Sequence, residues 1–175
     1  PHFREGMTVL VHSYSTCVLD ILESLSERGI QIKVITTEAH PSNTGKVVAD
    51  RYSKMGFETE IIYDSAVAMV MPQIDAVLVG CEAVLANGGV INKIGTYSVA
   101  LIASHFNKPT YVFCESFKFM ETFPLGQDDV AEMVAESEGQ DFYTMKVDYT
   151  PPQHLDLFFT DHGIFTASGI SDELT

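Results

Sequence analysis

The sequence predicts an α/β fold, a Rossmann-like doubly wound parallel sheet with helices on both faces. Short apolar runs of strand length alternate along the chain with longer segments in which apolar residues recur at helical spacing. The connections between them are short, which is typical of right-handed βαβ units. The length of 175 residues suits one domain, so residues 1–175 are expected to form a single Rossmann-like unit.

Strands are expected where short apolar runs are bounded by turn residues. These runs cover residues 7–11, 30–35, 58–63, 76–79 and 110–113, and a last one at 155–159 is expected to be a buried strand or a short helix. Helices are expected over residues 16–28, 44–55, 65–71 and 96–106. The first helix has Ser15 or Thr16 as its cap and Gly29 as its stop.

The glycine-rich stretch 80–95 and the acidic stretch 128–141 are expected to lie outside this pattern. The first predicts a loop. The second contains no Lys or Arg and holds the acidic residues Asp128, Asp129, Glu132, Glu136, Glu138 and Asp141. Because neighbouring like charges repel, it is expected to be an exposed or mobile loop, with a short helix as the alternative.

The charge of the chain excludes some classes of function. The chain has 24 acidic residues against 10 Lys and Arg, a formal net charge of −14. Such a surface repels phosphate backbones, so direct binding of nucleic acid is disfavoured. Basic protein partners and small ligands remain open.

The cysteines and the lack of long apolar segments predict a soluble, cytoplasmic protein. Cys17, Cys81 and Cys114 are odd in number and widely spaced, which is typical of a reducing compartment. No Cys or His spacing predicts a metal site, and no cofactor is expected. No apolar stretch approaches the roughly 20 residues that span a bilayer, and no signal peptide is recognised. Because the sequence begins at Pro1 without Met, it is expected to be part of a longer chain.

Ligands of open parallel sheets bind beyond the carboxyl ends of the strands. The loops expected there are residues 12–16, 37–45, 80–82 running on through 87–96, and 115–119. Together they offer hydroxyls, amides, lysine and backbone N–H groups, which favours a pocket for a small anionic ligand.

Several residues of these loops allow two interpretations. The hydroxyls of Ser13, Ser15 and Thr16 could simply cap the first helix. His12 at the end of a strand is more often a structural histidine than a general base. Glu82 could either cap a loop or transfer a proton.

The segment 92–96 is harder to explain as a plain turn. Asn92 and Lys93 stand directly ahead of a helix start at Gly95 and Thr96, where charge and N–H donors would meet a phosphate. The spacing is not that of a Walker loop or of GxGxxG, so binding of a nucleoside triphosphate has no motif support. GxSxG is also absent, which argues against a serine hydrolase.

Several separated motifs resemble those of one known family. They are VGCEAVLANGGVINKIGT at 79–96, PTYV at 109–112, ESFKF at 115–119, DYTPP at 148–152 and SDEL at 171–174. These motifs resemble the regulatory subunits of eukaryotic translation initiation factor 2B, and the alpha type fits better than the beta or delta type. That family is similar in fold to methylthioribose-1-phosphate isomerase and ribose-1,5-bisphosphate isomerase.

The resemblance implies a non-catalytic regulatory subunit of the guanine-nucleotide exchange factor that acts on translation initiation factor 2. It implies a C-terminal domain behind an N-terminal helical domain, a homodimer, and assembly with beta and delta subunits. It also implies sensing of the phosphorylated alpha subunit of factor 2. The apolar stretches 117–123 and 155–165 are expected either to form a subunit interface or to close the core of the sheet.

The resemblance to the isomerases also allows a test for catalysis. It implies a catalytic Cys where this chain has Ser13, an Asp at Glu82, a second Asp at Gly89 and a phosphate-binding Arg at His40. A serine hydroxyl cannot supply thiolate character. Without a guanidinium, bidentate recognition of phosphate is lost. These departures predict a pocket that has lost its catalytic function.

The site is therefore expected to be a vestigial sugar-phosphate pocket that could still hold a sugar phosphate or a nucleotide. Its residues are His12, Ser13, His40, Glu82, Asn92, Lys93, Gly95 and Thr96. The alternative function is a sugar-phosphate aldose–ketose isomerase that uses Glu82. A third reading is an unrelated α/β domain that binds a small ligand.

Overall fold

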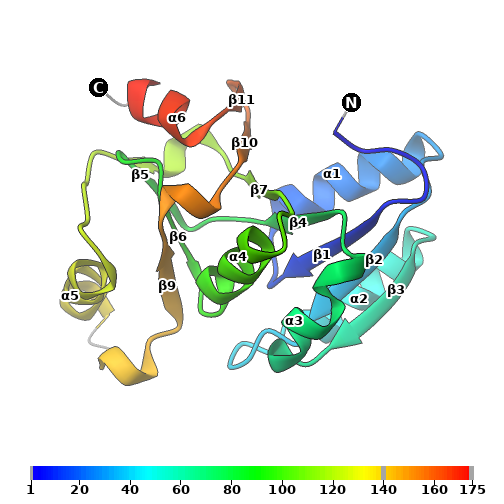
Figure 1. Cartoon of the computed structure of the whole chain (residues 1–175), viewed down its shortest axis with the longest axis horizontal. Coiled ribbons are helices and arrows are strands. Elements are labelled where there is room, and N and C mark those ends of the chain that lie inside the picture. Colours follow the sequence, from blue (N-terminus) through cyan, green and yellow to red (C-terminus); the bar gives the residue numbers. More distant parts are fainter. Residues whose placement is uncertain (1, 139–140, 174–175) are drawn as a thin grey trace.

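The fold is built on a seven-stranded sheet in the part of the chain that the computed structural model describes, residues 2–138 and 141–173. Its strands are β1 (Thr8–His12), β2 (Lys33–Thr37), β3 (Glu58–Ile62), β4 (Ala76–Val79), β7 (Thr110–Phe113), β10 (Leu157–Thr160) and β11 (Gly163–Phe165). They lie in the order β11-β10-β7-β4-β1-β2-β3 (Figure 1). Neighbours from β10 to β3 pair in parallel, and β11 is antiparallel to β10.

Helices cover both faces of this sheet. They are α1 (Thr16–Glu27), α2 (Gly45–Lys54), α3 (Val67–Val70), α4 (Thr96–His105) and α6 (Ala167–Glu173). Val9 of β1 shares a core with Leu22 of α1 and Tyr52 of α2. Its neighbour Leu10 shares the opposite core with side chains of α3, α4 and α6, among them Val99. Because successive side chains of β1 enter different cores, the predicted doubly wound α/β fold is confirmed.

A second, smaller sheet was not predicted. Its strands are β8 (Phe119–Met120), β5 (Ala83–Leu85), β6 (Val90–Lys93) and β9 (Val147–Thr150), in that order. The stretch 80–95, expected to be a loop, contains the antiparallel hairpin of β5 and β6. Gly88, at φ +82°, supplies the left-handed turn of this hairpin. The loop prediction was wrong here because the glycines belong to a tight turn between two short buried strands.

The acidic stretch forms a helix, α5 (Gln127–Glu138). Val130 and Val134, one turn apart, are buried against the second sheet in a cluster with Leu85 and Tyr149. Asp128 and Asp129 lie in its first turn, where negative charge is favourable. Over residues 128–138 the expectation of a loop is therefore wrong, and the alternative of a short helix is the correct one. Residues 139–140 of that stretch lie outside the described residues.

The other predicted elements form with small shifts at their ends. The strand expected at 30–35 lies at 33–37, and the helix expected at 65–71 is α3 with a 3₁₀ turn on each side. The terminal run forms β10 rather than a helix. Among the described residues, no helix has both the length and the apolar character needed to cross a membrane.

Strand β10 contributes to the core of the sheet, and this predicts that substitutions in β10 and in its partner β11 have different effects on stability. Phe158 is fully buried, whereas Ile164 is 51% exposed. Phe158→Ala should lower the free energy of unfolding in urea by about 3–5 kcal/mol, because it leaves a cavity. Ile164→Ala should change it by less than about 0.5 kcal/mol. Equal, small effects of both substitutions would show that residues 155–165 do not close the core.

Candidate functional site

The carboxyl ends of β1, β2 and β4 meet at one edge of the main sheet, beside the loop between β6 and α4. His12 ends β1 there and is 2% exposed. Its Nδ1 lies 2.7 Å from Thr37 Oγ1, and its Nε2 lies 2.8 Å from the carbonyl oxygen of Ile94. Because a carbonyl only accepts, Nε2 carries the proton and donates, and Nδ1 accepts from the Thr37 hydroxyl.

His12 is a neutral, structural histidine. Burial lowers the pKa of its imidazole, against opposing effects of the bond to Ile94 and of Asp64, whose Oδ1 is 3.9 Å from Nδ1. The ring also lies tightly against Gly95, since a Cβ there would stand 2.9 Å from two ring atoms. Gly95 has φ +99°, a left-handed backbone conformation that favours glycine. Glycine is therefore required at this position both by the backbone and by the closeness of the His12 ring.

Ser13 follows His12 in an unusual backbone conformation. Its φ of +67° lies in the left-handed region, which non-glycine residues seldom adopt. The side chain is 1% exposed, and its hydroxyl has no hydrogen-bond partner among the described residues. Strained backbone and an unsatisfied polar atom together are typical of a functional position.

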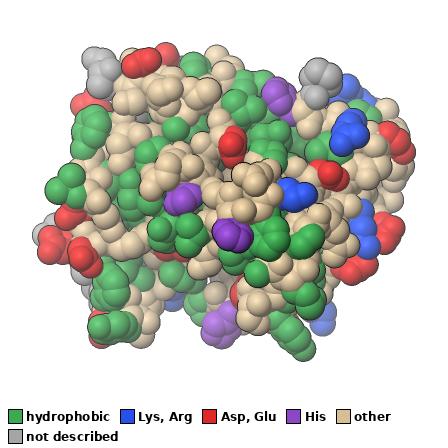
Figure 2. Space-filling view, in the orientation of Figure 1, with side chains coloured by type: hydrophobic (Ala, Val, Ile, Leu, Met, Phe, Trp, Pro, Cys, Tyr) green, Lys and Arg blue, Asp and Glu red, His purple; other side chains and the backbone are tan. Residues whose placement is uncertain are grey.

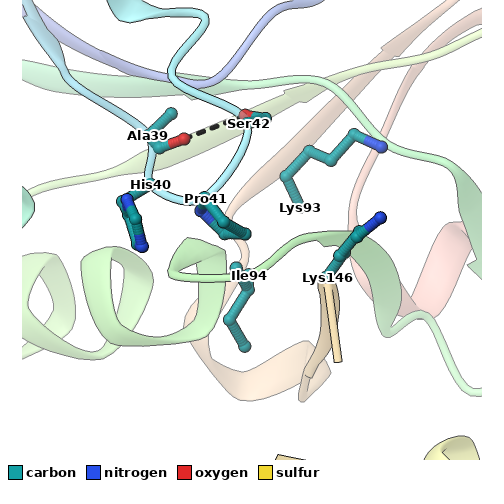
Figure 3. Close-up of a pocket in the computed structure, with 7 residues that line it drawn as sticks. All are labelled: Ala39, His40, Pro41, Ser42, Lys93, Ile94 and Lys146. Carbon is teal, nitrogen blue, oxygen red and sulfur yellow. Dashed lines mark hydrogen bonds between the residues drawn. The ribbon is translucent and has the colours of Figure 1, made fainter. Parts of the chain in front are cut away.

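Two cavities border this edge, and Lys93 lines both. The smaller, of about 210 Å³, lies between the β2–α2 loop and the β6–α4 loop (Figure 3). The larger, of about 370 Å³, is lined by Tyr14, Ser15, Thr16, Cys81, Glu82, Asn92, Lys93 and Lys118. Lys93 and Lys146 lie on one side of the smaller cavity and His40 on the other, and both amino groups point away from His40 (Figure 3).

Positive charge is concentrated at these cavities. A neighbouring groove of about 450 Å³ shares Tyr14 and Thr16 with the larger cavity. It adds Arg51 and Lys54 but also Asp20 and Glu23, and Lys54 is itself ion-paired with Asp50. The three cavities together are lined by five of the ten Lys and Arg residues of the chain, namely Arg51, Lys54, Lys93, Lys118 and Lys146. The two cavities that share Lys93 are lined by three lysines and by one acid, Glu82. In a chain of net charge −14, they are the cavities suited to an anion.

The cations of the larger cavity already have partners within the protein. Lys93 Nζ lies 2.5 Å from Glu82 Oε1, and both side chains are about two-fifths exposed. Lys118 Nζ donates to the carbonyl oxygen of Cys81 at 3.0 Å. Ion pairs at this exposure are weak, so a ligand phosphate could replace Glu82 as the partner of Lys93.

The start of α4, which the sequence offered to a phosphate, is occupied by Asp148 of β9. Asp148 Oδ2 accepts the N–H groups of Gly95 at 2.8 Å and of Tyr97 at 3.1 Å. Asn92 donates to Thr96 Oγ1 at 3.1 Å, and that hydroxyl donates to the carbonyl of Lys93 at 2.6 Å. Gly95 and Thr96 therefore shape the loop, and the side chains of Asn92 and Lys93 are those that reach a cavity.

His40 lies apart from His12 and Ser13. It is exposed in the β2–α2 loop, where its backbone N–H donates to Asp64 Oδ2 at 2.8 Å. Its side chain lines the smaller cavity, and Glu82 lines the larger. The structure thus brings the predicted residues to one edge but not into one pocket. His40 lines the smaller cavity, Glu82 and Asn92 line the larger, and Lys93 lines both. The other four predicted residues line neither cavity: His12, Ser13, Gly95 and Thr96.

Gly89 has its space filled by Tyr149. A Cβ at Gly89 would stand 2.4 Å from the Tyr149 ring and 2.8 Å from its hydroxyl. That hydroxyl accepts a hydrogen bond from Asn87 at 2.8 Å. A carboxylate of the kind that the isomerase resemblance places at position 89 has no room in this packing.

Sequence reasoning missed the partners that hold the site. Thr37, Asp64 and Asp148 orient its loops, and Lys146 adds a cation. Of these four residues, only Asp148 belongs to a motif noted in the sequence, as the first residue of DYTPP. Within the described part of the chain, no group of three or more His, Cys, Asp or Glu side chains is arranged to hold a metal ion.

Asp148 should give the protein a distinctive dependence of stability on pH. Burial raises the pKa of Asp148 from 3.8 to about 7, against the lowering effect of the Tyr97 and Gly95 N–H groups. Between these values the folded state binds a proton that the unfolded state has lost, so stability falls as pH rises from about 4 to about 7. The free energy of unfolding should fall by about 4 kcal/mol over this range, since a difference of one pKa unit corresponds to about 1.36 kcal/mol.

The measurement is urea unfolding of the wild type and of Asp148→Asn at a series of pH values. The difference between the two curves isolates Asp148 from the other acids. A difference that does not change with pH would contradict the raised pKa.

The contact between Gly89 and Tyr149 predicts a second effect on stability. Gly89→Asp should lower the free energy of unfolding by about 1–3 kcal/mol, because the new side chain overpacks the Tyr149 ring. Tyr149→Val in the same chain should restore part of the loss. Gly126→Asp is the matched control, since nothing lies within 4 Å of a Cβ at Gly126. An equal loss at Gly126 would show that the cost is not steric.

The comparisons with known proteins agree with this geometry. A model of the Initiation factor 2 subunit family matches residues 1–167. The translation initiation factor eIF2B subunit alpha of Dictyostelium discoideum is 37% identical over 188 residues, covering 98% of this chain and 59% of that protein. The subunit of the same name from Caenorhabditis elegans is 39% identical over 178 residues, covering 98% and 58%.

An enzyme and a solved structure are also similar. The ribose 1,5-bisphosphate isomerase of Methanocaldococcus jannaschii is 31% identical over 175 residues, covering 95% of this chain and 57% of the enzyme. The crystal structure of the Pyrococcus horikoshii OT3 translation initiation factor eIF-2B has a TM-score of 0.79 at 26% identity, covering 94% of this chain and 60% of that one. The chain thus spans less than two thirds of each relative. Because the family match runs through both sheets and the whole site, the chain belongs to the Initiation factor 2 subunit family.

Proposed function

We propose that this chain acts in a non-catalytic regulatory subunit, of the alpha type, in the cytoplasmic guanine-nucleotide exchange factor for translation initiation factor 2. The two alpha-subunit relatives, at 37% and 39% identity, are more similar to it than the Methanocaldococcus isomerase at 31%. These matches cover less than two thirds of each relative, so the activity and partners of the whole protein are part of the proposal. Residues 1–175 act in it as one Rossmann-like domain.

The observation that carries the loss of catalysis is the hydroxyl of Ser13. It stands at the position where the isomerase resemblance places a catalytic thiol, and it is buried with no hydrogen-bond partner in the part of the chain that the structure describes. An alcohol does not ionise near neutral pH, so it would need a neighbouring base to act. Both ring nitrogens of His12, the residue before it, are engaged with Thr37 and Ile94. No activated nucleophile is therefore available at Ser13.

The other reactive groups at the site do not replace this thiol. Cys81 lines the larger cavity, but its hydrogen bond with Cys114, followed by burial, raises the pKa of its thiol. A thiol that stays protonated is a poor nucleophile. The carboxylate of Glu82 is already engaged by the amino group of Lys93.

The proposed remaining function of the pocket is to bind a sugar phosphate or a nucleotide through its phosphate. Lys93 is shared by both cavities, with Lys118 in the larger and Lys146 in the smaller. Tyr14, Ser15 and Thr16 add hydroxyl groups suited to a sugar. Binding without conversion would make such a metabolite a regulatory ligand of the subunit.

The proposed partners are a second copy of the chain, the beta and delta subunits, and the alpha subunit of factor 2. Exposed apolar side chains support a contact surface on the segment that includes β8: Phe117 is 77% exposed, Phe123 61% and Leu125 96%. The other expected surface, residues 155–165, mostly closes the core, since Leu155 and Phe158 are buried. The proposed subunit contact is therefore limited to residues 117–125.

The experiment pairs a turnover assay with a binding assay. The purified chain should not convert ribose 1,5-bisphosphate, yet calorimetry should detect binding of this compound. Lys93→Ala should weaken binding by at least about tenfold, since a charge-assisted contact to phosphate is lost. Lys46→Ala, an exposed lysine outside the cavities, should leave it unchanged. Measurable turnover would overturn the non-catalytic assignment, and equal effects of both variants would overturn the assignment of the site.

A further inference from the structure

The loop between β6 and α4 is held at nearly every peptide group from Lys93 to Tyr97. The carbonyl of Lys93 accepts from Thr96 Oγ1, and the N–H of Ile94 donates to the carbonyl of Lys146 at 2.8 Å. The carbonyl of Ile94 accepts from His12, as described above. A surface turn needs none of these side-chain contacts, because water would satisfy the same groups.

The contacts come from both sheets. His12 reaches the loop from β1 of the main sheet, and Asp148 reaches it from β9 of the second sheet. In the second sheet Asp148 is directly opposite Asn92, one residue before Lys93. Its carboxylate then accepts the N–H groups of Gly95 and Tyr97, on the other side of Lys93. Lys93 is thus fixed between two points that β9 controls.

This arrangement changes how an anion could bind. At an open helix start, backbone N–H groups would bind a phosphate directly. Here Asp148 holds those donors, so binding energy has to come from Lys93 and the other side chains of the cavities. Lys93 contributes only if its backbone directs Nζ into the cavities, where it now meets Glu82.

We propose that Asp148 is a positioning residue that, by capping the start of α4 from the second sheet, aims Lys93 into the two cavities. It acts as an acceptor for two N–H groups and not through contact with the ligand. Because Lys93 is the centre of the anion site proposed above, this role rests on that proposal for binding, but the placement of Lys93 can be measured without any ligand.

Three variants separate the acceptor from the charge. Asp148→Asn keeps an oxygen at the same reach and removes the charge. Asp148→Ala removes both, and Asp148→Glu keeps the charge while moving the acceptor by one methylene. Asp75→Ala is the matched control, since Asp75 Oδ2 accepts the N–H of Thr8 at 2.8 Å at the opposite edge of the main sheet.

The first readout is the affinity for inorganic phosphate, measured by calorimetry on the 175-residue chain. Asp148→Ala and Asp148→Glu should each weaken it by at least about tenfold, and Asp148→Asn and Asp75→Ala by less than about threefold. The glutamate variant gives the same test should the alanine variant not fold. If the asparagine variant loses as much affinity as the other two, or if Asp75→Ala does, the positioning role is wrong.

The second readout is the rate at which acetic anhydride acetylates Lys93, measured by mass spectrometry relative to the exposed Lys46. A Lys93 amino group that is no longer held against Glu82 is more accessible to the reagent, so the rate should rise in Asp148→Ala and Asp148→Glu but not in Asp148→Asn. Failure of the wild type to bind phosphate would contradict the proposed anion site but not the positioning role of Asp148. Equal acetylation rates of Lys93 in the wild type and all variants would contradict the positioning role of Asp148, whatever the result of the phosphate-binding measurement.

Discussion

One buried carboxylate joins the two sheets of this protein. Asp148 belongs to the second sheet, and the N–H groups that it accepts begin α4, which packs on the main sheet. Burial of this carboxylate disfavours its charged form, which is why its pKa rises to about 7. Buried N–H groups at a helix start without an acceptor would also be unfavourable. Replacing Asp148 would remove the unfavourable burial of a carboxylate. It would also leave the N–H groups of Gly95 and Tyr97 without their acceptor, which is unfavourable in turn.

The same contact decides where positive charge is available. A helix start and its lysine would ordinarily form one anion site. On the face drawn in Figure 2, Lys and Arg side chains lie mainly over the right half, mixed with acidic ones. With the helix start closed, Lys93 lines its two cavities together with Lys118 and Lys146. These cations lie in cavities open enough for a ligand to exchange with Glu82. Reversible binding is the chemistry that this distribution of charge favours, in a chain that is otherwise strongly acidic.

The sequence predicted those elements whose pattern is local. The strands and helices around the main sheet each contain enough residues to show their own period, and the carboxyl-end rule then brought His12, Glu82 and Lys93 to one edge. The hairpin of β5 and β6 was not predicted, because strands of three and four residues are too short to show an alternating pattern of apolar and polar residues. The cap on α4 escaped for a different reason: Asp148 lies 53 residues from Gly95, so only the register of the second sheet reveals it.

The proposed loss of catalysis rests on several packed positions, and such a loss is hard to reverse. The Gly89 position has been filled by the Tyr149 ring, whose hydroxyl is fixed by Asn87. At the Ser13 position the neighbouring imidazole is committed to the β6–α4 loop, so a thiol restored there would still lack a free base. At both positions a neighbouring side chain fills the space or is engaged elsewhere in the fold. A single substitution by the residue that the isomerase resemblance implies would therefore disturb these contacts without supplying the rest of the chemistry.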